Sequence, residues 1–169
     1  MNTLYITIGN VGSGKSTWTR FFAGRQARRI YILDADDIRT MLNGGIYNFN
    51  PEIEPAIYNS IIDLGSSLIA RADVIIDGLN HKSTRRKRII NIFKENNPEI
   101  QIVGILFPPR VEHLERRMNE PRGYSPDHWK GVFNEISSGF EYPELSEGFD
   151  EILTIDDVLD FIKMATFKG

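Results

Sequence analysis

One glycine-rich segment near the beginning of the chain limits its possible folds more than any other feature. Residues 9–16 satisfy the pattern G-x-x-x-x-G-K-[ST]. A β-branched and aromatic run at 3–8 predicts a buried strand before the segment, and residues 15–23 predict a helix after it. A turn between such elements directs backbone N–H groups and the helix N-terminus at one point, so the sequence predicts a phosphate-binding loop.

We expect this loop to bind ATP together with Mg²⁺. Lys15 is expected to bridge the β- and γ-phosphates and to act in catalysis, and Ser16 to ligate Mg²⁺ through its hydroxyl. The residues expected to contact the nucleotide are those of the loop itself: Gly9, Asn10, Val11, Gly12, Ser13, Gly14, Lys15, Ser16 and Thr17. The alternative is a strand-to-helix turn without a ligand, which the complete motif disfavours.

Strand and helix patterns alternate along the rest of the chain. Strands are predicted at 29–33, 73–77, 99–107 and 151–155, and helices at 36–42, 52–71, 83–94, 111–119, 126–137 and 158–164. The helix at 83–94 is expected to be capped by Ser83. This alternation predicts the α/β class: one P-loop kinase domain over residues 1–169, with a five-stranded parallel sheet sandwiched by helices and a helical lid at about 110–130.

The composition excludes several classes of protein. Cysteine is absent, which excludes thiol catalysis and zinc–thiolate sites. No apolar run approaches the ~18–20 residues of a membrane span, and the first residues lack the pattern of a signal peptide. We therefore expect a cytoplasmic protein with no membrane partner. The net charge of −3 argues against non-specific coating of nucleic acid, and the oligomeric state stays open.

The loop alone does not separate the classes of P-loop protein. The Asn-Lys-x-Asp segment with which signalling GTPases bind guanine is absent. AAA-type motors and helicases are expected to need longer chains with extra subdomains. A compact kinase remains, in which a second substrate supplies the attacking hydroxyl. Such a reaction needs a proton acceptor near that hydroxyl and cations around the transferred phosphoryl group.

An acidic segment after the second predicted strand supplies candidates for the acceptor side. Asp36 is expected to accept the proton of the attacking hydroxyl, and Arg39, one helical turn later, to contact the acceptor substrate. Helix capping is the alternative for an aspartate at a helix start. For Asp34 and Asp37, helix capping and a role in the reaction are equally weighted.

The end of the third predicted strand supplies a candidate metal ligand. Asp77 follows three apolar residues, as an acidic Mg²⁺ ligand does in P-loop proteins, so we expect it to ligate Mg²⁺ together with Ser16. Asn80 follows in the next turn and is expected to contact the acceptor. For both residues the alternative is a simple turn at a strand end.

Arginines gather near the expected lid and in one other helix. Arg117 and Arg122 are expected to contact the nucleotide phosphates, with Arg122 catalytic because it lies in a loop. The alternative places one of Arg116 and Arg117 on an exposed face, paired with acidic neighbours. The cluster of Lys82 and residues 85–88 could attract a polyanion, but a solvated helix face is the favoured interpretation.

These motifs resemble the 5′-kinase domain of polynucleotide kinases. Residues 12–18 look like the loop of the phage enzymes, including the tryptophan, and 36–39 like the family's base segment. Residues 77–80 are similar to its Asp-x-Thr-Asn turn, with leucine in place of threonine, and 117–123 look like its lid. Residues 140–149 resemble the closing Phe-Glu-x-Pro-x-x-x-Glu-Gly-Phe segment of the animal domain.

The resemblance implies an ATP- and Mg²⁺-dependent kinase that acts on the 5′-hydroxyl of a DNA or RNA end. It makes Asp36 the general base and Arg39 the contact to the acceptor phosphate. We expect Phe140, Tyr142 and Phe149 to pack their segment against the core. Two alternatives stay open: a kinase of a small metabolite, antibiotic or sugar nucleotide, and a nucleotide-binding regulatory protein without transferase activity.

Overall fold

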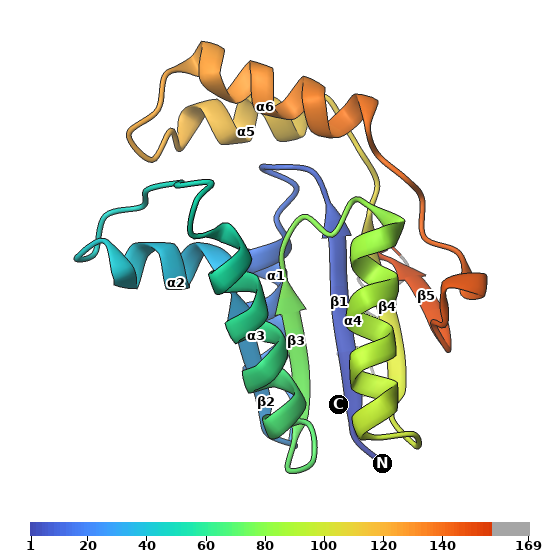
Figure 1. Cartoon of the computed structure of the whole chain (residues 1–169). Helices are drawn as coiled ribbons and strands as arrows, with labels where there is room; N and C mark the ends of the chain where they lie inside the picture. Colours follow the sequence, from blue (N-terminus) through green and yellow to red (C-terminus); the bar gives the residue numbers. More distant parts are fainter. Residues whose placement is uncertain (157–169) are drawn as a thin grey trace.

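Five parallel strands form the sheet on which the candidate site is built. The computed structural model describes residues 1–156, so the helix predicted at 158–164 lies outside the described residues. The sheet has the order β2-β3-β1-β4-β5 (Figure 1). Its strands are β1 (Thr3–Gly9), β2 (Ile30–Asp34), β3 (Asp73–Asp77), β4 (Gln101–Phe107) and β5 (Glu151–Thr154). The predicted α/β class with a five-stranded parallel sheet is confirmed.

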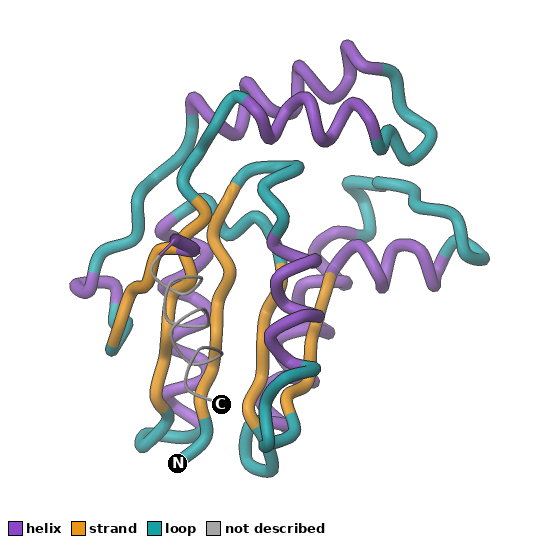
Figure 2. The backbone as a smooth tube through the Cα atoms, turned by 180° about the vertical axis from the view of Figure 1, so that it is seen from behind, coloured by secondary structure: helices purple, strands orange, loops and turns teal. Residues whose placement is uncertain are grey.

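Helices flank this sheet on both faces. Figures 1 and 2 show α3 and α4 on one face and α1 on the other, while α5 and α6 lie across the carboxyl ends of the strands, where the sequence places the lid. The helices are α1 (Lys15–Ala23), α2 (Ala35–Leu42), α3 (Glu54–Leu68), α4 (Ser83–Asn96), α5 (Glu112–Asn119) and α6 (Pro126–Ser138), with a 3₁₀ turn, η1 (Leu145–Glu147). None of the helices in the described part is long and apolar enough to cross a membrane.

The central strands are buried because helices cover both faces of the sheet. Leu4, Ile6 and Ile8 of β1 are fully buried in the larger core, which the inward faces of α3 and α4 complete. A smaller core on the α1 side contains Trp18 and Phe107. The fully apolar runs of the sequence therefore correspond to strands covered on two sides.

The start of α4 differs from its predicted cap. Ser83 is the first residue of the helix, not its cap, and Lys82 at the N-cap position makes no side-chain cap. The free N–H of Ser83 instead donates to the Glu141 carboxylate at 2.7 Å, and this hydrogen bond lowers the pKa of Glu141 to about 2. A segment distant in the sequence therefore supplies the cap.

The prediction that the basic residues of α4 form a solvated face is wrong for Arg86. Its side chain is fully buried and forms a bidentate ion pair with Glu147, in which Nε and Nη2 donate to the two carboxylate oxygens at 2.7 and 2.6 Å. The same guanidinium donates to the carbonyls of Asn80 and Glu141. Arg86 thus joins the segment 140–149 to the turn after β3.

The aromatic residues of the segment 140–149 pack only in part as predicted. Phe149 is buried in the larger core and Phe140 packs against it. Tyr142 is exposed, so the prediction is wrong for this residue. The ion pair and the helix cap, more than aromatic packing, tie the segment to α4.

Candidate phosphoryl-transfer site

The glycine-rich loop requires glycine at two positions. Gly12 and Gly14 have φ angles of 71° and 89°, in the left-handed region that other residues rarely adopt. A Cβ on Gly12 would lie 2.0 Å from the carbonyl oxygen of His113, because α5 lies directly over the loop. The loop is therefore covered closely by the lid helices.

Asn10 ties the loop to the second lid helix. Its side chain is fully buried and its Nδ2 donates to the Phe133 carbonyl at 3.0 Å and to Ser137 Oγ at 2.8 Å, both in α6. Its Oδ1 accepts from the N–H of Val11 at 2.7 Å. The Asn10 side chain therefore anchors α6 on the loop, a role that the sequence motif did not indicate.

Lys15 is buried with its ammonium over the loop. Its Nζ donates to the carbonyls of Gly9 and Asn10 at 3.0 and 2.7 Å and to Ser13 Oγ at 3.1 Å. Burial lowers the pKa of Lys15 to about 8, against the opposing effect of the Asp77 carboxylate. The side chain therefore stays mostly charged at pH 7 and can meet an anionic phosphate.

Ser16 and Asp77 share a neighbour and form the candidate Mg²⁺ site. Asp77 accepts from the hydroxyls of Thr7 at 2.9 Å and Thr19 at 3.3 Å, and Thr19 also donates to the Ser16 carbonyl. A hydroxyl and a carboxylate are the oxygen ligands that Mg²⁺ prefers. No cluster of three or more His, Cys, Asp or Glu among residues 1–156 could hold a metal, so phosphate and water oxygens would have to complete the ligand set.

Asp34 lies beside Asp77 on the neighbouring strand. The two are register partners between β2 and β3, and Asp34 caps α2 by accepting from the Asp36 N–H at 2.8 Å. Burial, and then the charge of Asp77, raises the pKa of Asp34 to about 7. Asp37 is exposed and pairs with Arg20 at 3.2 Å. The capping interpretation is confirmed for Asp34, and the position of Asp37 in the first turn of α2 suits the helix dipole.

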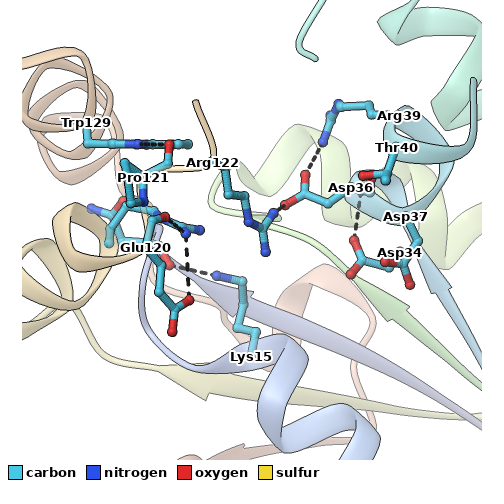
Figure 3. Close-up of polar contacts among 12 residues, drawn as sticks. Lys15, Asp34, Asp36, Asp37, Arg39, Thr40, Glu120, Pro121, Arg122 and Trp129 are labelled. Atoms are coloured by element: carbon cyan, nitrogen blue, oxygen red, sulfur yellow. Dashed lines mark hydrogen bonds and ion pairs between the residues drawn. The ribbon is translucent and has the colours of Figure 1, made fainter. Parts of the chain in front are cut away.

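Asp36 lies between two arginines from distant parts of the chain. One of its oxygens pairs with Arg39 and the other accepts from Arg122 Nη1 at 2.6 Å (Figure 3). In the same view Lys15 lies below Arg122, with its ammonium turned toward the loop carbonyls. The structure thus brings together the three residues predicted to be catalytic, Lys15, Asp36 and Arg122, at the carboxyl edge of the sheet.

Arg39 is more fully bonded than the sequence suggests. It is buried, forms a two-pronged ion pair with Glu54 at the start of α3, and donates to the Tyr58 hydroxyl at 3.3 Å. Glu54 was not predicted as a site residue, because nothing in its local sequence distinguishes it from any acid at a helix start. Most donors of Arg39 are therefore taken by Glu54 and Tyr58, and Nη1 pairs with Asp36.

The lid arginines occupy three different environments. Arg122 has a φ angle of 50° and lies over the Tyr47 ring, with its Cζ 5.4 Å from the centroid. Arg117 is buried and packs over the Trp129 ring at 4.8 Å. Arg116, not predicted as a ligand, donates to the Gly12 carbonyl at 3.3 Å. Arg116 therefore bonds the loop directly, while the nucleotide contact of Arg117 stays a prediction.

Asn80 has a structural position inside the turn after β3. It is buried with a φ angle of 42°, and its Nδ2 donates to the Thr7 carbonyl at 2.8 Å. Its Oδ1 accepts from Arg85 Nε at 3.2 Å. These bonds hold the turn against β1, so the geometry favours the turn interpretation over direct contact with the acceptor.

Two cavities flank the site. One of about 510 Å³ lies beside the loop, between α1 and α5, and is lined by Gly14, Thr17, Trp18, Phe21 and Arg116 among others. Its position next to the loop and its aromatic walls suit the nucleoside part of a nucleotide. The other, of about 650 Å³, lies between α3 and α4 on the acceptor side.

Comparison with known proteins gives a family and a fold. A family model described as an AAA domain matches residues 4–140. No curated protein sequence matches the chain significantly. In the described residues the domain consists of the α/β unit and the two helices above it, without a further subdomain.

Solved structures similar to this chain fall into two groups. A chain in the Pnkp1/Rnl/Hen1 complex is 27% identical, with a TM-score of 0.59 over 69% of this chain and 38% of its own length. A chain of the Pnkp1/Rnl/Hen1 RNA repair complex is 22% identical, with a TM-score of 0.65 over 88% of this chain and 46% of its own. This chain therefore spans less than half the length of these relatives.

The second group matches over its full length. The APS kinase of Mycobacterium tuberculosis, solved with AMPPNP and APS, is 16% identical, with a TM-score of 0.58 over 99% of this chain and 98% of its own. At this identity the likeness shows the fold alone. The fold is therefore shared by an APS kinase and by chains of an RNA repair complex.

Proposed function

Because the chain belongs to the AAA-domain family and has its P-loop kinase-like nucleotide-binding fold, we propose that it is an ATP- and Mg²⁺-dependent kinase of polynucleotide 5′-hydroxyls. One observation carries the proposal: the Asp36 carboxylate is held between Arg39 and Arg122, beside Lys15 at the carboxyl edge of the sheet. A proton acceptor next to two cations is what phosphoryl transfer to an alcohol requires.

In the proposed reaction the acceptor oxygen forms a bond to the γ-phosphorus and the bond to the β–γ bridging oxygen breaks. The hydroxyl proton passes to Asp36, and ADP leaves. Asp36 Oδ2 becomes available when Arg122 turns from it toward the transferred phosphoryl group, while Arg39 keeps the carboxylate in place. Arg122 thus couples arrival of the phosphoryl group to release of the base.

On the donor side the chain supplies fixed positive groups. Lys15 and the N–H groups of the loop stabilise charge on the β- and γ-phosphates without reorganisation during the reaction. Mg²⁺, held by Ser16 and Asp77, would neutralise further charge on the same phosphates. The cavity beside Trp18 would take the nucleoside.

Support for a polynucleotide acceptor comes from the motifs and from one relative. The 27% identity to a chain of the Pnkp1/Rnl/Hen1 complex favours this acceptor class, and a second structure of that assembly is described as an RNA repair complex. A second candidate function is a kinase of a small molecule, which the end-to-end likeness to APS kinase favours. A regulatory nucleotide-binding protein is disfavoured by the assembled group of Lys15, Asp36 and Arg122.

A phosphoacceptor panel tests the proposal. Purified protein is incubated with γ-labelled ATP, Mg²⁺ and either 5′-hydroxyl DNA or RNA oligonucleotides or small alcohols and sugar nucleotides. We expect label at oligonucleotide 5′ ends, absent with 5′-phosphorylated oligonucleotides and with the Asp36→Asn variant. Label on small acceptors alone would establish the second candidate function, and turnover of ATP without any labelled acceptor would overturn both.

A further inference from the structure

The cavity between α3 and α4 adjoins the acceptor side of the site. It has a volume of about 650 Å³ and is lined by Glu54 and Tyr58 of α3 and by Arg85 and Arg88 of α4. Glu54 and Tyr58 both bond Arg39, which in turn pairs with Asp36. The cavity is therefore separated from the proposed base by a single bonded side chain.

Two arginines give this cavity uncompensated positive charge. Arg85 stacks on the Tyr58 ring, with its Cζ 3.1 Å from the centroid, and Arg88 donates to Asn59 Oδ1 at 2.8 Å. Within residues 1–156 neither arginine has a carboxylate partner in an ion pair. The carboxylate of Glu54 is already paired with Arg39 and the charge of Lys82 with Glu141.

The floor of the cavity has the opposite character. Ile61, Ile62, Ile76 and Ile89 line it with aliphatic carbon. An apolar floor beside an aromatic ring, with two cations at the rim, matches the alternation of flat bases and phosphates in a single strand. In a paired duplex the base faces are stacked within the helix and could not lie on such a floor.

We propose that this cavity is a subsite for the nucleotides that follow the reacting end of a single-stranded polynucleotide. The bases lie on the apolar floor beside the stacked Arg85 and Tyr58 side chains, and the phosphates pair with Arg85 and Arg88. This proposal rests on the proposed function and deepens it, because it assigns single-strand recognition to α3 and α4. A small alcohol bound at Asp36 makes no use of the subsite.

A series of acceptors of increasing length tests the subsite. The acceptors are 5′-hydroxyl single strands, from a nucleoside 3′-phosphate to a hexanucleotide, with one duplex that has a blunt 5′-hydroxyl end. We compare wild type with Arg88→Ala, which removes an exposed side chain, and with Arg85→Ala/Arg88→Ala. Lys87→Ala removes an exposed cation of the same helix that does not line the cavity, and serves as matched control.

In wild type we expect KM to fall as the acceptor becomes longer. The double variant should lose this dependence on acceptor length, so that its KM for the hexanucleotide is about tenfold or more above that of wild type. The KM for the nucleoside 3′-phosphate and all values of kcat should change less than about twofold. The slope of log KM against log salt concentration should be smaller in the double variant by about 1.4, because each of the two lost phosphate contacts contributes about 0.7 for single strands. Thermal unfolding of each variant shows whether it is folded, and Arg85→Lys/Arg88→Lys should restore most of the length effect.

The outcomes separate the two proposals. If wild type phosphorylates the oligonucleotides but the double variant and Lys87→Ala behave like wild type at every length, the subsite is overturned and the proposed function stands. A KM that rises equally for the shortest and longest acceptors would also overturn the subsite, because the arginines would then act at the reacting end. If wild type phosphorylates none of the oligonucleotides, the proposed function fails, and the subsite with it.

Discussion

The donor and acceptor halves of the site are built in different ways. The donor half is one continuous loop, residues 9–17, whose shape follows from left-handed glycines and a helix N-terminus. The acceptor half takes Asp36 and Arg39 from α2, Glu54 from α3 and Arg122 from the lid. Triphosphate binding is therefore specified locally, whereas acceptor choice depends on how separate elements pack.

One buried network connects Asp77, beside the loop, with the segment 140–149. Asp77 bonds Thr7, the Thr7 carbonyl accepts from Asn80, and the Asn80 carbonyl accepts from Arg86, which pairs with Glu147. The N–H of Gly9 also donates to the Leu79 carbonyl at 3.0 Å. The segment 140–149 thus supports the turn after β3, which in turn bonds the first residue of the loop.

The largest expected effect is that of Lys15→Ala on the donor half. Loss of the buried ammonium should reduce kcat by about 10³-fold or more, since it removes a positioned cation at the transferring phosphate. If the halves are independent, the affinity for a 5′-hydroxyl oligonucleotide should not change. Steady-state kinetics and fluorescence anisotropy with a labelled acceptor measure the two, and a parallel loss of acceptor affinity would show that the halves are coupled.

Asp36→Asn is the corresponding change in the acceptor half. It keeps the shape of the side chain but removes the proton acceptor, so kcat should fall by ~10²–10⁴-fold. ATP affinity measured by calorimetry should stay within about twofold of wild type. An unchanged kcat would remove Asp36 from the mechanism, and a large loss of ATP affinity would show that its pairing with Arg122 organises the donor side.

The contrast between the halves also explains what the sequence could predict. The loop, the strands and the pairing of helices with strands follow from local patterns, so the fold class and Lys15 were predictable. Glu54 pairs with a residue 15 positions away, Glu147 with one 61 away, and Asn10 anchors α6 across 123 residues. Such partners are determined by tertiary packing and leave no local signal.

The solvated-face interpretation failed at Arg86 for the same reason. A basic run on a helix with an apolar face is normally exposed, because burial of an unpaired guanidinium is unfavourable. Here Glu147, supplied by a turn 61 residues later, makes burial of the guanidinium possible. Glu147 belongs to the segment 140–149, whose resemblance to the kinase family was recognised in the sequence. The motif alone did not show that this segment contacts α4.

Glu147→Ala tests the buried ion pair that ties the segment 140–149 to α4. Removal of one partner from a buried ion pair leaves Arg86 uncompensated, so the free energy of unfolding should fall by about 3–5 kcal/mol. Urea unfolding measures this loss. The replacement of both partners, Arg86→Met/Glu147→Met, should recover much of it. A single variant within about 0.5 kcal/mol of wild type would contradict a structural role for the pair.

The smallest expected effect concerns Asp34, where the two halves meet. In the unfolded chain this carboxyl titrates near pH 4, whereas its pKa in the folded protein is raised to about 7 by burial and then by Asp77. Between about pH 4 and pH 7 the folded state therefore holds a proton that the unfolded state has released. The free energy of unfolding contributed by this group consequently falls as the pH rises through that window.

Asp34→Asn should remove this pH dependence while keeping the cap of α2, because asparagine is an equally good N-cap. At pH 8 the variant should be more stable than wild type by about 1 kcal/mol or more, and the difference should disappear toward pH 4.5. Urea unfolding in EDTA at several pH values measures it, with exposed Asp37→Asn as control. A difference that does not vary with pH would mean that Asp34 is ionised in the folded protein throughout. The acidic pair at the boundary would then be stabilised by its neighbours over the whole pH range measured.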